Sequence, residues 1–183
     1  MRYTETTLPG VLLVDLERHE DERGFFARLW CQKELAERGL NPNLSQCSIS
    51  ANCAAGTLRG MHYQAQPHPE AKFVQCIRGS IYDVALDLRT NSPTFGKWFA
   101  AELTADSRRM LYLPEGCAHG FQTLADDSDV LYFISTPFYP DLSRGVRWND
   151  PAFRIDWPKP IQLISERDRK FPLWTEPIPA TTS

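Results

Sequence analysis

The chain has 183 residues, 42% of them hydrophobic, so it can bury one good core, and we expect residues 1–183 to form a single domain. A net charge of −3 gives no overall attraction to nucleic acid, and no apolar run is long enough to span a bilayer. The first residues lack the apolar core of a secretory signal, which predicts a cytoplasmic location. The five cysteines include no Cys-x-x-Cys pair, which favours reduced thiols over disulfides or a zinc site.

The first predicted elements are a strand, a charged turn and a second strand. Residues 10–16 are rich in strand formers, and residues 20–24 make a charged turn into Phe25 and Phe26. Arg23 in this turn is either a solvated loop residue or a guanidinium presented to an anion. The next segment, residues 31–38, is amphipathic and is closed by Gly39, which predicts one short helix.

From Leu44 onward, short segments of strand character recur at close spacing with turn residues between them. The predicted strands are residues 46–52, 56–64, 72–77, 80–88, 97–103, 109–113, 119–124 and 129–135. In residues 80–88, alternation places Tyr82, Val84, Leu86 and Leu88 on one face of a half-buried antiparallel strand. This all-β pattern predicts a jelly roll or a similar two-sheet barrel.

After Pro137 the chain is rich in proline, which favours extended, wrapping segments and permits only short helices. The prolines are Pro140, Pro151, Pro158, Pro160, Pro172, Pro177 and Pro179. We therefore expect a C-terminal wrapping segment on the barrel, with no second domain.

Residues 56–64 are the most informative stretch, because an arginine and a histidine lie three residues apart between glycines. Strand alternation predicts that His62 shares a face with Leu58, Gly60 and Gln64, while Arg59, Met61 and Tyr63 take the other face. A neutral imidazole is well suited to take a proton near neutral pH, so His62 is a candidate base. The alternative is a surface histidine on an edge strand.

His62-Tyr63-Gln64, Glu70 and the later His119 resemble the two motifs of cupin jelly rolls. A metal-binding cupin supplies a His-x-His pair, an acid and a later histidine, because a borderline metal prefers imidazole-rich ligation. Gln64 replaces the second histidine here, which favours a metal-free pocket lined by His62 and His119. We predict no metal and no cofactor; a metal-dependent cupin such as a dioxygenase is the alternative.

Four longer segments resemble the dTDP-4-dehydrorhamnose 3,5-epimerase family: Asp21–Phe26, Gly56–Gln64, Pro114–Phe121 and Arg147–Pro151. The resemblance implies a cupin-type jelly-roll double-stranded β-barrel with a few short helices. It also implies a metal-independent epimerase of nucleotide-diphosphate 4-keto-6-deoxyhexoses, which inverts carbons 3 and/or 5 through an enolate in a deoxysugar pathway such as dTDP-rhamnose biosynthesis. Members exchange amino-terminal strands across a homodimer, and residues 7–16 are apolar enough to pair with a neighbouring sheet.

The same resemblance assigns catalytic roles. His62 falls on the family's base, Asp168 on the acid that orients and charge-stabilises it, and Tyr132 on the proton donor. Carbons 3 and 5 of the sugar flank a ketone, so a side-chain base can remove their protons if the enolate is stabilised electrostatically.

Binding positions are carried over in the same way. The substrate-binding residues implied are Arg23, Arg59 and His119 along the channel, Lys72 near the ketone, Gln46 and Ser48 at the nucleoside, Phe138 stacking on the base, and Arg167. Arg28 and Ser143 depart from the family, since many members have glutamate at both positions. A single-site epimerase, a ketoisomerase on another sugar such as a CDP-linked one, and a non-catalytic sugar-binding cupin therefore stay open.

Overall fold

The computed structural model of the protein describes residues 1–175. The strands of one sheet are β1 (Arg2–Glu5), β2 (Leu12–Asp15), β5 (Gln46–Asn52), β7 (Lys72–Arg78), β10 (Met110–Leu113) and β12 (Ser128–Ile134). Those of the second sheet are β6 (Thr57–Gln64), β8 (Ser80–Asp87), β9 (Trp98–Thr104), β11 (Cys117–Thr123), β13 (Ser143–Gly145) and β14 (Leu163–Ile164). The remaining elements are β3 (His19–Asp21), β4 (Gly24–Phe26), α1 (Gln32–Glu37), the short 3-10 helix η1 (Pro140–Leu142) and α2 (Glu166–Arg169).

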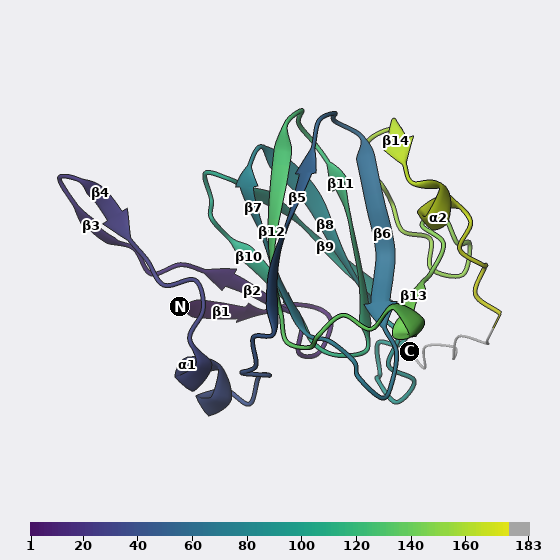
Figure 1. Ribbon diagram of the computed structural model, residues 1–183, viewed down its shortest axis with the longest axis horizontal. Coiled ribbons are helices and arrows are strands. Elements are labelled where there is room, and N and C mark those ends of the chain that lie inside the picture. Colours follow the sequence, from purple (N-terminus) through teal and green to yellow (C-terminus); the bar gives the residue numbers. More distant parts are fainter. Residues whose placement is uncertain (176–183) are drawn as a thin grey trace.

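The two large sheets form the barrel, with α1 and α2 at its margins (Figure 1). The first runs β1-β2-β10-β7-β12-β5, and the second runs β13-β6-β11-β8-β9 with β14 alongside β6. The predicted all-β jelly-roll class is confirmed. Strands β1, β13 and β14 were missed because each is only two to four residues long and is formed by pairing with a neighbour rather than by its own sequence pattern.

A main core between the sheets is flanked by two outer layers. Helix α1 packs on the first sheet through Leu35, and residues 146–174 cover the second sheet. Tyr82, Val84, Leu86 and Leu88 share a face as predicted, and they pack under this C-terminal covering. The strand is not half-buried, however, because its other face lies in the main core. Pro177 and Pro179 of the predicted wrapping segment lie outside the described residues.

The charged turn near the amino terminus is shorter than predicted. Glu20 and Asp21 belong to β3, so the turn of the β3–β4 hairpin is formed by Glu22 and Arg23. The hairpin extends away from the barrel (Figure 1), and Phe26, the last residue of β4, is 75% exposed.

An irregularity in β6 overturns the predicted alternation. His119 of β11 pairs with His62, but Phe121 pairs with Arg59, so β6 holds one residue more than β11 over this interval. Gly60 lies at this bulge with a φ of 133°, which favours glycine. The extra residue turns Arg59 and His62 toward the same side. The prediction that they occupy opposite faces is therefore wrong.

The turn from β8 to β9 is organised by a fully buried carboxylate. Asp87 accepts hydrogen bonds from Arg89, Ser92 and Thr94. Burial pushes its pKa up, but these hydrogen bonds outweigh burial and lower the pKa to about 2.

Between residues 1 and 175, no helix is long and apolar enough to cross a membrane, and all five cysteines are free thiols.

We expect Asp87→Asn to lower the free energy of unfolding by about 2 kcal/mol near pH 6. The folded-state pKa is depressed, so this stabilisation is complete above the unfolded pKa near 4 and is lost as the pH falls toward 2. Urea unfolding at several pH values measures it, with Asp106→Asn, at an exposed loop aspartate, as the control. If the difference in the free energy of unfolding between wild type and Asp87→Asn stayed constant between pH 6 and pH 2.5, this account would be contradicted.

Candidate active site

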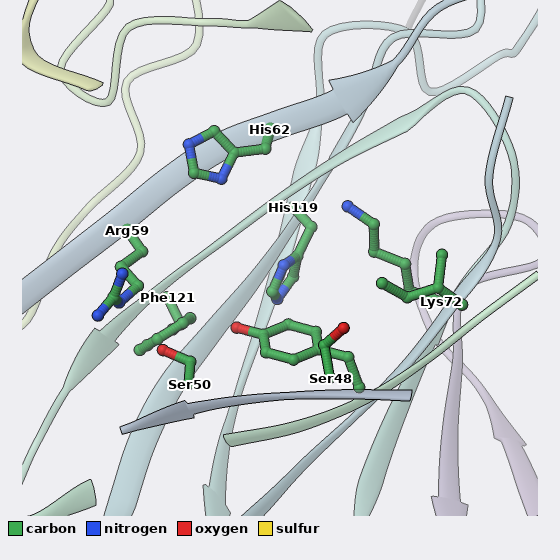
Figure 2. A pocket seen from close by; sticks show the side chains of 9 residues that line it. Ser48, Ser50, Arg59, His62, Lys72, His119 and Phe121 are labelled. Atoms are coloured by element: carbon green, nitrogen blue, oxygen red, sulfur yellow. The ribbon is translucent and has the colours of Figure 1, made fainter. Parts of the chain in front are cut away.

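A cavity of about 270 Å³ lies between the two sheets. Its walls are Ser48 and Ser50 on β5, Arg59 and His62 on β6, Lys72 on β7, His119 and Phe121 on β11, and Tyr132 and Ile134 on β12. Figure 2 shows Arg59 and His62 on one side of this space, Ser48 and Ser50 on the opposite side, and His119 between them. Basic and polar side chains from five strands thus converge inside an otherwise apolar barrel.

His62 is held by a buried carboxylate that is distant in the sequence. Its Nε2 lies 2.7 Å from Oδ1 of Asp168, and Asp168 is only 4% exposed. The second oxygen, Oδ2, accepts a hydrogen bond of 3.2 Å from the backbone N–H of Gly60. An ionised carboxylate only accepts hydrogen bonds, so the neutral ring donates its Nε2–H and Nδ1 is left as the basic nitrogen.

Asp168 is placed by the start of helix α2. Ser165 is the N-cap residue, and its Oγ accepts the backbone N–H of Asp168 at 3.0 Å. The carboxylate is thereby free to reach β6. Burial pushes the pKa of Asp168 up, but the hydrogen bond and charge of His62, with the amide of Gly60, hold it below its ordinary value. Asp168 therefore stays ionised and can stabilise a protonated His62.

A second histidine on the neighbouring strand is held in the same way. Nε2 of His119 lies 2.7 Å from Oδ1 of Asp83, and both side chains are almost fully buried. The other oxygen of Asp83 is buried with no hydrogen-bond partner in the described part of the chain. Asp83 lies on the core-facing side of β8, where its charge acts on the cavity.

Tyr132 is the phenol of this cavity, and its ring meets that of His119 edge to face at a centroid distance of 5.9 Å. Burial, and then the charge of Asp83, raise the pKa of Tyr132 well above its usual range, against a smaller opposing effect of Arg59. The phenol consequently holds its proton throughout the neutral pH range, so it can act as a proton donor and not as a base.

The residues weighed as metal ligands are engaged otherwise. The amide of Gln64 is bound to backbone groups of two loops. Glu70 forms an ion pair of 2.7 Å with Lys72, in which both side chains are largely buried. Within residues 1–175, no group of three histidine, cysteine, aspartate or glutamate side chains is arranged to hold a metal ion.

An adjoining cavity of about 440 Å³ shares Arg59 and His62 with the first and is also lined by Arg167 and Asp168 of α2. Nε of Arg59 donates to Asn52 at 2.8 Å, and one N–H of Arg167 donates to Oγ of Ser143 at 2.7 Å. Two guanidinium groups therefore border one open space, an arrangement suited to phosphate oxygens.

The structure brings together most of the site residues predicted from the sequence. Those gathered at the two cavities are His62, Tyr132, Asp168, Ser48, Arg59, Lys72, His119 and Arg167. Within one chain it does not bring Arg23, Gln46 or Phe138 to the cavity walls. Arg23 lies in the hairpin turn paired with Asp21, and Phe138 is 56% exposed.

Sequence reasoning missed Asp83 and Ser50. Asp83 left a usable signal, since it is a carboxylate on the inward face of a strand whose other inward residues include Ile81 and Ala85. Ser50 left none, because a serine on an edge strand is ordinarily solvated.

Comparisons with known proteins agree with one another. Residues 5–176 match the family model described as dTDP-4-dehydrorhamnose 3,5-epimerase. A dTDP-4-dehydrorhamnose 3,5-epimerase from Methanothermobacter thermautotrophicus is 39% identical over 181 residues, covering 97% of each chain. The crystal structure of such an epimerase from Elizabethkingia anophelis superposes with a TM-score of 0.92 at 36% identity, covering 95% of this chain and 96% of the other. Another, from Bacillus anthracis with TDP and PPi bound, gives 0.88 at 38% identity, covering 94% and 99%.

Proposed function

Because the chain belongs to the dTDP-4-dehydrorhamnose 3,5-epimerase family, we propose that it epimerises a nucleotide-diphosphate 4-keto-6-deoxyhexose at carbons 3 and 5. The observation that carries the proposal is the pairing of His62 with buried Asp168 in a cavity that also contains the protonated phenol of Tyr132. This supplies an oriented base and a separate acid, which inversion at a carbon requires.

The reaction follows from the roles of these groups. Nδ1 of His62 removes the proton from a carbon beside the ketone, and the C–H electron pair moves into an enolate. Lys72 supplies positive charge in the same cavity, and Asp168 stabilises the protonated imidazole. Tyr132 then donates its proton to the opposite face, which restores the ketone with inverted configuration and leaves a phenolate. The imidazolium of His62 then releases its proton and the phenolate regains one, so both groups are reset before the next turnover.

Charge explains how an acidic chain holds an anionic substrate. Arg59 and Arg167 border the adjoining cavity and are assigned to the diphosphate, next to the sugar site. The nucleobase is assigned to Phe138, with Gln46 and Ser48 contacting the nucleoside. The TDP and PPi bound to the Bacillus anthracis relative support this substrate class.

Proton NMR in deuterated water with dTDP-4-keto-6-deoxyglucose tests the proposal. Loss of the signals at carbons 3 and 5, with formation of the epimer, is the expected result. Loss at one carbon alone would indicate a single-site epimerase. If neither signal were lost, with CDP-linked sugars equally inert, the proposed reaction would be wrong and a non-catalytic sugar-binding role would replace it.

We also infer a homodimer that exchanges the amino-terminal region. The β3–β4 hairpin projects from the barrel with Phe25 and Phe26 exposed, and β5 is an edge strand on which Ile49 is 63% exposed (Figure 1). Arg23 lies in the hairpin turn, and its side chain is 84% exposed. If this hairpin docked on a second copy of the chain, Arg23 of the first copy would approach the substrate channel of the second. Residues 1–183 then act as one domain per protomer, and a cytoplasmic location stays a prediction.

Sedimentation is expected to give twice the chain mass of 20.9 kDa at micromolar concentration. Phe26→Asp, which places a charge in an apolar contact, is expected to yield monomer, whereas Arg23→Ala is expected to keep the dimer and raise KM about tenfold. A wild-type protein that sediments as a monomer would contradict the inference.

A further inference from the structure

Gln64 joins the loop that precedes β7 to the loop that follows β12. It is 4% exposed and lies on β6 two residues after His62. Its Nε2 donates to the carbonyl oxygen of His68 at 2.6 Å and to that of Pro137 at 3.1 Å. Its Oε1 accepts the backbone N–H of Tyr139 at 2.9 Å. Three hydrogen bonds of one buried amide are thus made to backbone groups, and a buried amide that lost such partners would be costly.

Two of these bonds flank one exposed aromatic residue. Pro137 and Tyr139 are the neighbours of Phe138, which is 56% exposed. The backbone on both sides of Phe138 is therefore fixed by a single side chain. The third bond fixes His68, whose ring stacks on that of Tyr139 at a centroid distance of 4.4 Å and an interplanar angle of 15°. Gln64 consequently holds both rings of this stack next to Phe138.

The same two loops continue directly from the cavity walls. The Phe138 loop follows Ile134, and the His68 loop leads to Lys72. Oγ1 of Thr136 also donates to the carbonyl of Pro69 at 2.7 Å, so the loops are tied together beside Gln64. The His62–Asp168 pair is held by helix α2 and not by these loops.

We propose that Gln64 is a positioning residue for nucleotide binding, which holds Phe138 ready to stack on the base of a nucleoside diphosphate. The proposal rests on the proposed function for the identity of the ligand and for the assignment of Phe138 to the nucleobase, since Phe138 does not line the cavity within one chain. A platform that is fixed before binding spares the entropy of ordering an exposed loop, so its effect falls on affinity rather than on the chemical step. Base stacking on an aromatic side chain is sequence-tolerant, and phenylalanine supplies the required face.

Gln64→Met removes the three hydrogen bonds of this amide at nearly constant side-chain volume, and Gln122→Met is the matched control. Gln122 is also fully buried on a strand of the second sheet, and it also bonds backbone groups of a loop, those of Lys159, at 2.8 and 3.0 Å. Both variants lose a buried amide anchor, but only Gln64 anchors the Phe138 loop. Gln64→Glu is the second variant, because it keeps the acceptor for Tyr139 and places carboxylate oxygen against two carbonyls.

The readouts are the Kd for dTDP by calorimetry, KM and kcat, and the melting temperature. Gln64→Met and Gln64→Glu are expected to raise Kd and KM about tenfold, which is the effect of losing one stacking contact. Both variants should keep kcat within about twofold of the wild-type value. Gln122→Met is expected to leave Kd within about twofold while lowering the melting temperature. In a Phe138→Ala background, Gln64→Met should change Kd by less than about twofold, since the two residues act as one unit.

Equal effects of the Gln64 and Gln122 variants on Kd, or full additivity of Gln64→Met with Phe138→Ala, would overturn the role of Gln64. Binding of dTDP by the wild-type protein without turnover would contradict the proposed epimerase and leave the role of Gln64 intact. A wild-type protein that bound no dTDP would contradict both.

Discussion

His62→Ala is expected to abolish deuterium exchange at both carbons beside the ketone and to lower kcat by about 10²- to 10⁴-fold. Nε2 of His62 is held on Asp168 at 2.7 Å, and this contact fixes the orientation of the ring and therefore the position of Nδ1. Alanine removes the base and leaves Asp168 buried without its partner. Of the other basic groups of the cavity, Lys72 is paired with Glu70 and the side chain of His119 is only 5% exposed, against 35% for His62, so neither replaces His62 directly.

The measurement is proton NMR of the substrate in deuterated water, with dTDP affinity as the check that the variant is folded. Asp168→Asn is the companion variant, because it keeps the shape but cannot carry the charge that stabilises the protonated imidazole. The rate of deuterium exchange in Asp168→Asn should lie between those of the wild-type protein and His62→Ala. Exchange at either carbon at the wild-type rate in His62→Ala would show that another group is the base at that carbon.

Tyr132→Phe is expected to separate exchange from epimerisation. Without the phenol, the enolate can be reprotonated only on the face from which His62 took the proton, so deuterium enters with retained configuration. Formation of the epimer should fall by about 10²-fold or more while exchange continues. The raised pKa of Tyr132 supports this role, since the phenol holds its proton at the pH of the reaction.

Tyr112→Phe is the matched control for this variant. Tyr112 is a buried tyrosine on β10, and its hydroxyl accepts a hydrogen bond of 3.3 Å from the backbone N–H of Asn41, outside the cavity. Removal of that hydroxyl should lower stability and leave the ratio of exchange to epimerisation unchanged. An epimer formed by Tyr132→Phe at the wild-type rate would show that the proton comes from elsewhere, and would revive the ketoisomerase and sugar-binding alternatives.

Most of the fold was predictable because the strands carry their own signals. The strand from Gln46 to Asn52 was placed at its observed bounds, and the other long strands were placed within a few residues. The elements that failed depend on partners. β13 forms against β6, and the hairpin turn at Arg23 is two residues shorter at its start because Glu20 and Asp21 pair with β4.

Most of the site residues predicted from the sequence meet at the two cavities, but their geometry was not predictable. His62, Tyr132 and Asp168 come from three distant parts of the chain, and only the resemblance to a family joined them. The shared side of Arg59 and His62 could not follow from strand periodicity, since one added residue at Gly60 reverses the alternation. The pairing of Asp83 with His119 likewise depends on the register between β8 and β11.

The bulge in β6 also limits how this cavity could be redesigned. A Cβ on Gly60 would lie 2.5 Å from the Cα of Gly120, and a Cβ on Gly120 would lie 2.9 Å from the backbone oxygen of Arg59. His62 and His119 are carried by the two antiparallel strands that approach closely at this point, and they are register partners. A library that diversified either glycine would therefore displace both histidines together. Variation of the wall residues Ser48, Ser50 and Ile134 offers independent control of cavity shape.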